Sequence, residues 1–420
     1  MSATSMRQLA EASRATCRTL ANASSDTKNA ALRDMARALR ADAKSILSAN
    51  EEDLAEAKAA GRPAAFLDRL ALTPARIEAM AEAVEAIVAL PDPVGEITER
   101  WKRPNGLQVS RMRLPLGVLL MIYEARPNVT SDAAALALKS GNAVILRGGR
   151  EALRSNGAIA RALRLGLISS GLPAEAVTLV TDVAHASLGA LLELEGLIDL
   201  CIPRGGQGLV KFVHEHARIP VVEHAEGVCH VYVHADADPE KAEDIVLNAK
   251  THRPGVCNAA ECLLIDSAVA PELLPRLGSA LSSKGVTLKA CPIALPLLER
   301  SGVEAVPAAP DDFGREFLDL TMAVRVVPDL DAALDHIGRF GSEHTEALVS
   351  EDRNTQRRFV REVAASAVVV NASTRFNDGG ELGLGAEIGI STSRMHAFGP
   401  MGLRELTSQK YVIHGTGQVR

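Results

Sequence analysis

Apolar and polar residues follow a helical spacing through about the first 90 residues of the chain. A stretch rich in Ala, Leu and Arg runs to about Ala60, where Gly61-Arg62-Pro63 breaks it. A second helix is expected to begin at Thr73-Pro74 and to end before Pro91, because Thr caps a helix and Pro fits its first turn. The pattern therefore predicts an N-terminal region made of α-helices.

Strand-like alternation begins at Ile97 and continues to Arg113, with Asn105-Gly106 near its middle. Asn-Gly between two alternating segments is typical of a tight turn between antiparallel strands. We therefore expect a β-hairpin here. The tail carries a similar short run, from Lys410 to His414.

From Val118 onward, short apolar runs alternate with helical patterns. In the first half, the predicted strands are Val118–Ile122, Ala143–Leu146, Val177–Val180 and Ile198–Ile202. The alternation resumes at Cys229–Val233 and continues to Ser366–Val370. Repeated strand–helix units predict parallel sheets covered by helices, here in two consecutive α/β halves. The crevice between such halves is the default ligand site.

Composition excludes several classes of protein. The 420 residues are 47% hydrophobic and 23% charged, as in an ordinary folded chain, and no apolar run approaches the roughly 20 residues of a membrane-spanning helix. A net charge of −6 and 3% aromatic residues argue against nucleic-acid binding. The N-terminus shows no apolar signal core, and the six cysteines form no CxxC motif, so we expect reduced thiols and a cytoplasmic location.

A metal site is not expected either. Cys229, His230 and His234 lie in one alternating strand, on which Cys229 faces away from both histidines.

Two glycine turns are candidate phosphate sites. Arg204-Gly205-Gly206-Gln207-Gly208 and Leu146-Arg147-Gly148-Gly149-Arg150 each follow a predicted strand and open a helix. Such turns let backbone amides approach a phosphate, and arginine binds phosphate through two parallel hydrogen bonds. Ordinary strand-to-helix turns have the same appearance, so the pattern leaves both readings open.

Cys257 is the candidate nucleophile. It follows Pro254-Gly255 in a loop between a predicted helix and a predicted strand. Lys250, His252 and Arg253 precede it, and such a basic setting favours the reactive thiolate. Cys262, inside the following strand, is expected to be an inert core thiol.

The whole chain resembles the aldehyde dehydrogenase superfamily. The resemblance rests on Leu114–Ile122, which is similar to the strand entering the cofactor domain, on Val221-Val222-Glu223 with the segment after it, and on the spacing from Glu223 to Cys257. A closer resemblance, to the gamma-glutamyl phosphate reductase family, is carried by motifs that span about residues 110 to 420. They are Ile122–Asp132, Leu146–Gly149, Asn248–Lys250, Arg253–Asn258, Phe340–Glu346, Val370–Gly380 and Gly399–Thr407.

That family reduces L-glutamate 5-phosphate with NADPH to the 5-semialdehyde and phosphate, in proline biosynthesis. The resemblance implies that Cys257 forms a thioester, which then takes hydride from the nicotinamide. It implies an oxyanion site at Asn128, for which Arg126 is an equally placed alternative. Glu223 matches the superfamily's water-activating glutamate, whose role a reductase does not need. A hydrolysing aldehyde dehydrogenase and a non-catalytic assembly module are the alternative functions.

The remaining site residues follow from the same comparison. Glu316 matches a contact to the nicotinamide ribose. Arg126, Arg253 and Asn258 are expected to bind the substrate, although either arginine could instead pair with a local acid such as Glu124 or Glu261. Residues from the glycine turns complete the expected cofactor site: Arg147, Gly148, Gly149, Arg150, Arg204, Gly205 and Gly206. Arg150 stands where enzymes that prefer NAD carry an acid, which favours NADPH.

The resemblance also implies a division of the chain. We expect an NADPH-binding, Rossmann-like domain over residues 1–94 and 116–225, a catalytic domain over 226–400, and a small oligomerisation β-element over 95–115 and 401–420. The Asn105-Gly106 hairpin and the tail strand match the two pieces that form the superfamily's intersubunit sheet, so the resemblance also implies a homodimer or tetramer. Exposed edge strands would otherwise favour aggregation. Direct transfer of the substrate from glutamate 5-kinase is a further possible partnership.

Overall fold

The computed structural model describes residues 3–222 and 226–420 and divides into two compact units. The first comprises the described residues up to 222 together with Leu384–Gly389 and Met401–Arg420. The second comprises residues 226–383 and Ile390–Pro400. Each unit contains a parallel sheet with helices, so the predicted α/β class with two consecutive units is confirmed. Within the described residues, no helix combines the length and the apolar character needed to span a bilayer.

Five helices form the N-terminal region of the first unit, as predicted. They are α1 (Ala3–Asn22), α2 (Ser25–Ala41), α3 (Ala43–Ala59), α4 (Ala64–Leu70) and α5 (Pro74–Val88). The Thr73 hydroxyl accepts the Arg76 N–H at the start of α5, which confirms the predicted cap. The single helix expected up to Ala60 is instead two helices, because the chain turns at Asp42.

The sheet of the first unit has four parallel strands in the order β5-β4-β3-β6. The strands are β3 (Val118–Tyr123), β4 (Ala143–Gly148), β5 (Val177–Leu179) and β6 (Leu200–Arg204). Each strand is followed by a helix: α6 (Asn128–Lys139), α7 (Leu153–Ser169), α8 (His185–Leu192) and α9 (Gln207–His216). β3 and β4 are buried along their whole length, so ligand contacts are confined to the ends of the strands.

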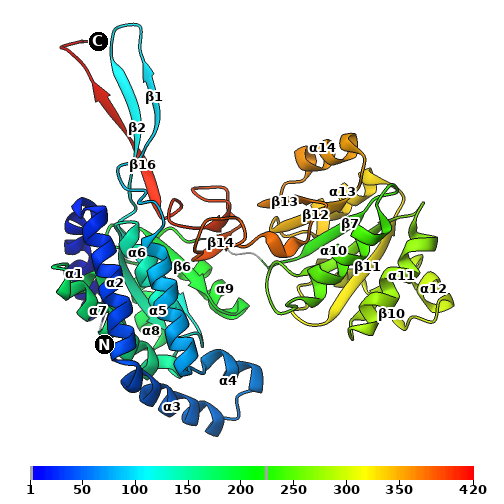
Figure 1. Cartoon of the computed structure of the whole chain (residues 1–420), viewed down its shortest axis with the longest axis horizontal. Coiled ribbons are helices and arrows are strands. Elements are labelled where there is room, and N and C mark those ends of the chain that lie inside the picture. Colours follow the sequence, from blue (N-terminus) through cyan, green and yellow to red (C-terminus); the bar gives the residue numbers. More distant parts are fainter. Residues whose placement is uncertain (1–2, 223–225) are drawn as a thin grey trace. The chain divides into compact units, whose positions relative to one another are not determined.

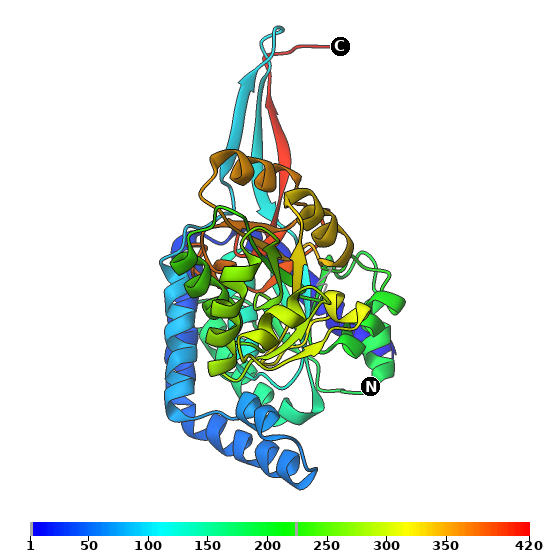
Figure 2. The ribbon, with the colours of Figure 1, turned by 90° about the vertical axis from the view of Figure 1, so that its right-hand side faces the viewer.

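A three-stranded antiparallel sheet extends from the first unit as an arm (Figures 1 and 2). It contains β1 (Ile97–Lys102), β2 (Gln108–Pro115) and the tail strand β16 (Thr407–His414). β1 and β2 form the predicted hairpin, and β16 pairs with the other edge of β2. The rings of Trp101 and Tyr411 meet edge to face across β2, with centroids 6.2 Å apart.

The second unit has a seven-stranded parallel sheet in the order β10-β9-β11-β8-β7-β12-β13. Its strands are β7 (Cys229–Val233), β8 (Ala260–Asp266), β9 (Thr287–Ala290), β10 (Ala305–Pro307), β11 (Thr321–Val327), β12 (Thr345–Val349) and β13 (Ala367–Val370). Its helices are α10 (Pro239–Thr251), α11 (Ala270–Ser283), α12 (Ala294–Arg300), α13 (Leu330–Phe340) and α14 (Arg353–Glu362). The apolar pattern did not predict β9, α12 and β10, which are short elements at one edge of the sheet (Figure 1).

Short elements complete the chain. They are the 3₁₀ helices η1 (Arg150–Ala152), η2 (Ala174–Ala176), η3 (Pro310–Gly314) and η4 (Thr374–Phe376), and the paired strands β14 (Gly389–Ser391) and β15 (Gly399–Met401).

Candidate active site

Cys257 lies half-buried in the turn that joins α10 to β8, as the sequence predicts. The backbone of this turn is packed against the residues that enter β7. A side chain at Gly227 would overlap the carbonyl oxygen of Cys257, and the Cys229 thiol donates to the same oxygen at 3.1 Å. Burial holds the pKa of the Cys229 thiol well above its ordinary value, so this thiol stays protonated and serves as a donor. The position of Cys257 is thus determined by its backbone neighbours.

The basic residues before Cys257 differ in the charge they offer. Lys250 is fully buried and forms an ion pair with the equally buried Glu261, with Nζ and Oε2 2.6 Å apart. Burial raises the pKa of Glu261 to about 7, against the opposing effect of Lys250. The positive charge of Lys250 is therefore neutralised in the core, whereas His252 and Arg253 are exposed.

Arg375 is a further cation near the Cys257 turn, and its sequence pattern predicted no role for it. It lies in η4, half-buried, and its Nε donates to His252 Nδ1 at 3.3 Å. Burial lowers the pKa of the Arg375 guanidinium, and the like charge of Arg253 lowers it further. The negative charges of Asp378 and the Cys257 thiolate act in the opposite direction and raise this pKa. Arg375 lies 118 residues after Cys257, so no local pattern connects the two. The one sequence signal for Arg375 is its place in the family motif Val370–Gly380.

Two other predicted residues lie in the same unit. Asn258 is buried, and its Nδ2 donates to the backbone carbonyl of Asn377 at 3.0 Å, which links the Cys257 turn to the segment after η4. Its Oδ1 is buried without a hydrogen-bond partner among the described residues. Glu316 follows η3 in a half-buried loop and accepts the Gly227 N–H at 3.0 Å. Burial raises the pKa of Glu316.

Asn128 and Arg126 lie in the first unit, after the carboxyl end of β3. Asn128 is the first residue of α6, is exposed, and donates from Nδ2 to Asp132 Oδ2 at 2.9 Å. Burial raises the pKa of Asp132 to about 6, although the Asn128 hydrogen bond and the charge of Arg204 favour its ionised form. Arg126 is exposed in the preceding loop. The geometry of this unit leaves both residues as candidates for an oxyanion site.

A pocket of about 390 Å³ in the first unit gathers residues from the carboxyl ends of the strands. Arg147, Gly149 and Arg150 line it with Gly208 of α9, so the two predicted glycine turns contribute to one cavity. Arg150 is exposed, whereas Arg147 is buried and donates from Nη2 to the Val183 carbonyl at 2.7 Å. Arg150 is therefore the more accessible of the two guanidinium groups.

The glycines of this pocket meet protein side chains at close range. A side chain at Gly149 would overlap the Glu151 carboxylate, and one at Gly148 would overlap the Asn156 amide. At the start of α9, the Gly206 N–H donates to Glu124 Oε2 at 2.9 Å. The helix terminus predicted for a phosphate thus already has a carboxylate partner, which a phosphate would have to displace. Glu124 and Glu261, the local acids named as alternative partners of the arginines, bind Gly206 and Lys250.

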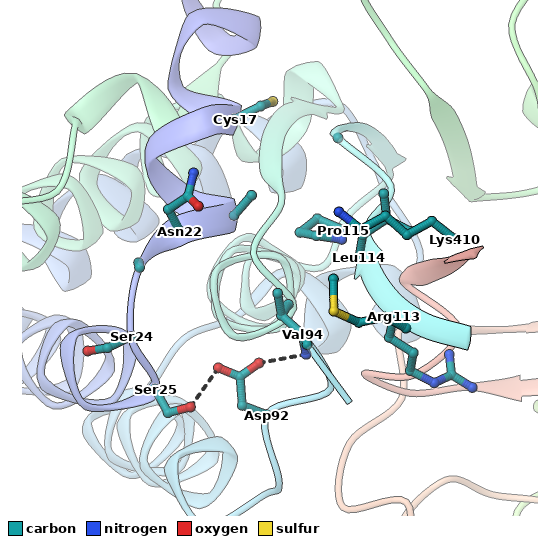
Figure 3. A pocket seen from close by; sticks show the side chains of 15 residues that line it. Cys17, Asn22, Ser24, Ser25, Asp92, Val94, Arg113, Leu114, Pro115 and Lys410 are labelled. Atoms are coloured by element: carbon teal, nitrogen blue, oxygen red, sulfur yellow. Dashed lines mark hydrogen bonds between the residues drawn. The ribbon is translucent and has the colours of Figure 1, made fainter. Parts of the chain in front are cut away.

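A larger pocket of about 620 Å³ lies at the base of the arm (Figure 3). The α1–α2 turn, residues 92–95, β2 and Lys410 line it. Asp92 organises one wall by accepting from Ser25 Oγ and the Val94 N–H, both at 2.9 Å. The predicted catalytic and cofactor residues are absent from this lining.

One buried cluster of metal-ligand types occurs among the described residues: His230, Cys262 and His336. The predicted separation of Cys229 from His230 holds, because Cys229 contacts the Cys257 turn. His230 Nδ1 instead contacts Glu346 Oε2 at 2.9 Å. The approach of Cys262 and His336 was not anticipated, since the three residues come from β7, β8 and α13. Glu223 lies outside the described residues.

Comparison with known proteins agrees with this architecture. The aldehyde dehydrogenase family profile matches residues 1–289. The chain is 58% identical over 418 residues to a gamma-glutamyl phosphate reductase from Anaeromyxobacter sp. (strain K), covering 100% of this chain and 98% of that protein. A relative of the same name from Solidesulfovibrio magneticus is 55% identical and covers 100% of this chain and 99% of that protein.

A solved structure shows the same fold over the full length. The crystal structure of a gamma-glutamyl phosphate reductase from Thermotoga maritima matches with a TM-score of 0.96 and 43% identity, covering 99% of each chain. The resemblance inferred from the sequence is therefore confirmed: this chain belongs to the aldehyde dehydrogenase family and, within it, to the gamma-glutamyl phosphate reductases, oxidoreductases of proline biosynthesis.

Proposed function

We propose that this protein reduces L-glutamate 5-phosphate to L-glutamate 5-semialdehyde and phosphate through a thioester on Cys257. The observation that carries this proposal is the half-buried thiol on a turn held by Gly227 and Cys229, beside Arg253 and Arg375. A thiolate near cationic groups attacks the acyl carbon, and phosphate leaves. The covalent thioester keeps the carbonyl in place while hydride is delivered.

The cofactor is proposed to be a nicotinamide dinucleotide, specifically NADPH, held by the first unit. When bound, it supplies the hydride. Gly149 lines the proposed cofactor pocket, Gly148 precedes it in the chain, and Arg147 and Arg150 place two guanidinium groups at its wall. Arg150 is proposed to bind the 2′-phosphate, because its exposed guanidinium attracts an anion there. Arg204, Gly205 and Gly206 are proposed to face the pyrophosphate, and Glu316 the nicotinamide ribose.

Arg253, Arg126 and Asn258 are proposed to bind the substrate, and Asn128 to stabilise the oxyanion, with Arg126 as its alternative. A buried anion needs paired partners, and Arg253 reaches solvent beside the nucleophile. Loss of one charged hydrogen-bonded contact typically costs about 1.5–3 kcal/mol. Arg253→Ala and Arg126→Ala should therefore lower kcat/KM for the acyl phosphate about ten- to hundredfold, with little change in the KM for NADPH.

Two measurements test the covalent mechanism. Cys257→Ala should abolish reduction while NADPH still binds, and Cys17→Ala, at another half-buried thiol, should retain most activity. In the reverse direction, oxidation of the semialdehyde by NADP⁺ should require phosphate. Reduction by the Cys257 variant at the wild-type rate would contradict the thioester, and oxidation without phosphate would indicate a hydrolysing aldehyde dehydrogenase.

The arm is proposed to form the oligomer interface of a homodimer or tetramer. It presents exposed Trp101, Tyr411 and Ile413 on the two outer strands. Removal of residues 407–420 should leave monomers in sedimentation analysis if this assignment is correct. None of the six cysteines, all of which the structure describes, is joined in a disulfide, and this fits the proposed cytoplasmic location. Transfer from glutamate 5-kinase stays a proposal for co-purification to test.

A further inference from the structure

Two arginines lie near the Cys257 turn within the second unit. Arg253 precedes it in the same turn, and Arg375 approaches from η4, far along the chain. The charge of Arg375 interacts with both Arg253 and the Cys257 thiolate. Two like charges at one place repel each other, so an anion between them would relieve the repulsion.

Arg375 has no carboxylate partner among the described residues. Its side-chain hydrogen bond goes to His252 Nδ1, a ring nitrogen that accepts and carries no proton in this contact. The carboxylates of Asp378 and Glu381 act on the guanidinium through their charge, without a hydrogen bond to it, and Asp378 Oδ1 accepts the Gly380 N–H at 2.9 Å. Glu261, the buried acid of this region, is paired with Lys250. A half-buried cation without a paired anion is costly, which indicates that an anionic ligand completes the site.

The phosphoryl group is the substrate anion that this position fits. In an acyl phosphate, one carbon is bonded to the phosphate oxygen and is also the atom that sulfur attacks. Arg375 is hydrogen-bonded to His252, five residues before Cys257, so its guanidinium lies on the side of the site where the sulfur attacks and where the phosphate is bonded. The α-carboxylate is at the opposite end of the carbon chain. Arginine also matches phosphate geometrically, since its planar fork donates two parallel hydrogen bonds.

We propose that Arg375, oriented by His252, binds the phosphoryl group of the substrate and stabilises the phosphate as it leaves. The Cys257 sulfur forms a bond to the acyl carbon, and the bond from that carbon to the phosphate oxygen breaks. The phosphate departs with that electron pair and takes a proton from water. This inference rests on the proposed function and adds the residue that receives the leaving group.

Alkylation of Cys257 tests the site without requiring turnover. Iodoacetamide labelling of the peptide containing Cys257, followed by mass spectrometry at constant ionic strength, should slow when inorganic phosphate is added. Arg375→Ala should need about ten- to hundredfold more phosphate for the same protection. Arg361→Ala, at an exposed arginine of the same unit, is the matched control and should behave as wild type. Thermal unfolding should confirm that each variant is folded, and Arg375→Lys should protect to an intermediate degree.

L-Glutamate distinguishes the two possible anions, because it carries the α-carboxylate without the phosphate. Phosphate protection that is unchanged in Arg375→Ala would overturn the proposal. The proposal would also be overturned if glutamate, and not phosphate, slowed the alkylation of Cys257 and if this effect were lost in Arg375→Ala. In the reverse reaction, Arg375→Ala should raise the KM for phosphate about tenfold or more, with the KM for NADP⁺ nearly unchanged.

His252 is a positioning residue in this scheme. His252→Ala should weaken the protection of Cys257 by phosphate, and His252→Asn, which keeps an acceptor oxygen, should restore it. Equal protection in the wild type and both variants would show that His252 does not position Arg375. The two proposals fail separately. Activity retained by Cys257→Ala would contradict the thioester, whereas the alkylation data would still show whether phosphate binds at Arg375.

Discussion

Replacing Lys250 by Met should destabilise the protein in a manner that depends on pH. Lys250 and Glu261 are 0% and 1% exposed, so the variant leaves a carboxyl group buried without its cation. Breaking a buried pair in this way costs about 3–5 kcal/mol. The pair joins the end of α10 to the start of β8, on either side of the Cys257 turn in the chain.

The sign of the pH dependence follows from the pKa of Glu261. Its folded pKa is raised to about 7, above its ordinary value of 4.5, so the native wild type loses stability as the pH rises between these values. Removing Lys250 raises that pKa further. As the pH rises towards 7, the wild type and Lys250→Met should therefore lose stability in parallel. Above pH 7 only Lys250→Met should continue to lose stability, by about 1.4 kcal/mol per pH unit, until the pH reaches the pKa of Glu261 in the folded variant.

Urea denaturation followed by circular dichroism at several pH values between 5 and 9 measures this difference. The control is Lys241→Met, which breaks the exposed Lys241–Glu351 pair and should cost at most about 1 kcal/mol at every pH. A double variant, Lys250→Met with Glu261→Leu, should recover most of the loss because no charge stays buried. Equal losses for Lys250→Met and Lys241→Met, or a loss independent of pH, would refute the reasoning.

Three further predictions concern the proposed site. Arg150→Glu should reduce or reverse the preference for NADPH over NADH in steady-state assays, because a carboxylate repels the 2′-phosphate. Arg161→Glu, at an exposed position of α7, is the control and should leave the ratio of kcat/KM for the two cofactors unchanged. An unchanged ratio in both variants would assign the 2′-phosphate contact to Arg147. Gly227→Ala should reduce kcat, since the added Cβ would overlap the Cys257 carbonyl and move the Cys257 turn. Gly338→Ala, at an open position of α13, is the control and should leave kcat unchanged. A wild-type kcat for Gly227→Ala would contradict the idea that the backbone of this turn positions the nucleophile. Wild-type kcat should fall as the pH drops through about 6, where Asp132 takes up a proton and no longer accepts from Asn128 as a carboxylate; Asp132→Asn should flatten that limb, and an unaltered profile would separate Asp132 from catalysis.

The sequence by itself predicted most of the elements and singled out a candidate nucleophile. Strand–helix alternation predicted the parallel sheets, because buried strands and amphipathic helices have different apolar periods. Thr73 capped α5 and Asn105-Gly106 turned the hairpin, since both act through local backbone chemistry. Cys257 stood out because a cysteine in a loop among basic residues is chemically unusual wherever the chain folds. The pattern did not predict short edge strands such as β9 and β10, because they bury too few residues to show a clear apolar periodicity.

Only the tertiary structure decided which charges act at the site. Lys250, His252 and Arg253 have equal standing in the sequence, yet folding buries Lys250 against Glu261 and leaves the other two exposed. Arg375 reaches His252 from 123 residues away, and Glu124 reaches Gly206 from a neighbouring strand end. The energy of a charge depends on its burial and on its partners, and both are set by contacts between distant segments that no local pattern records.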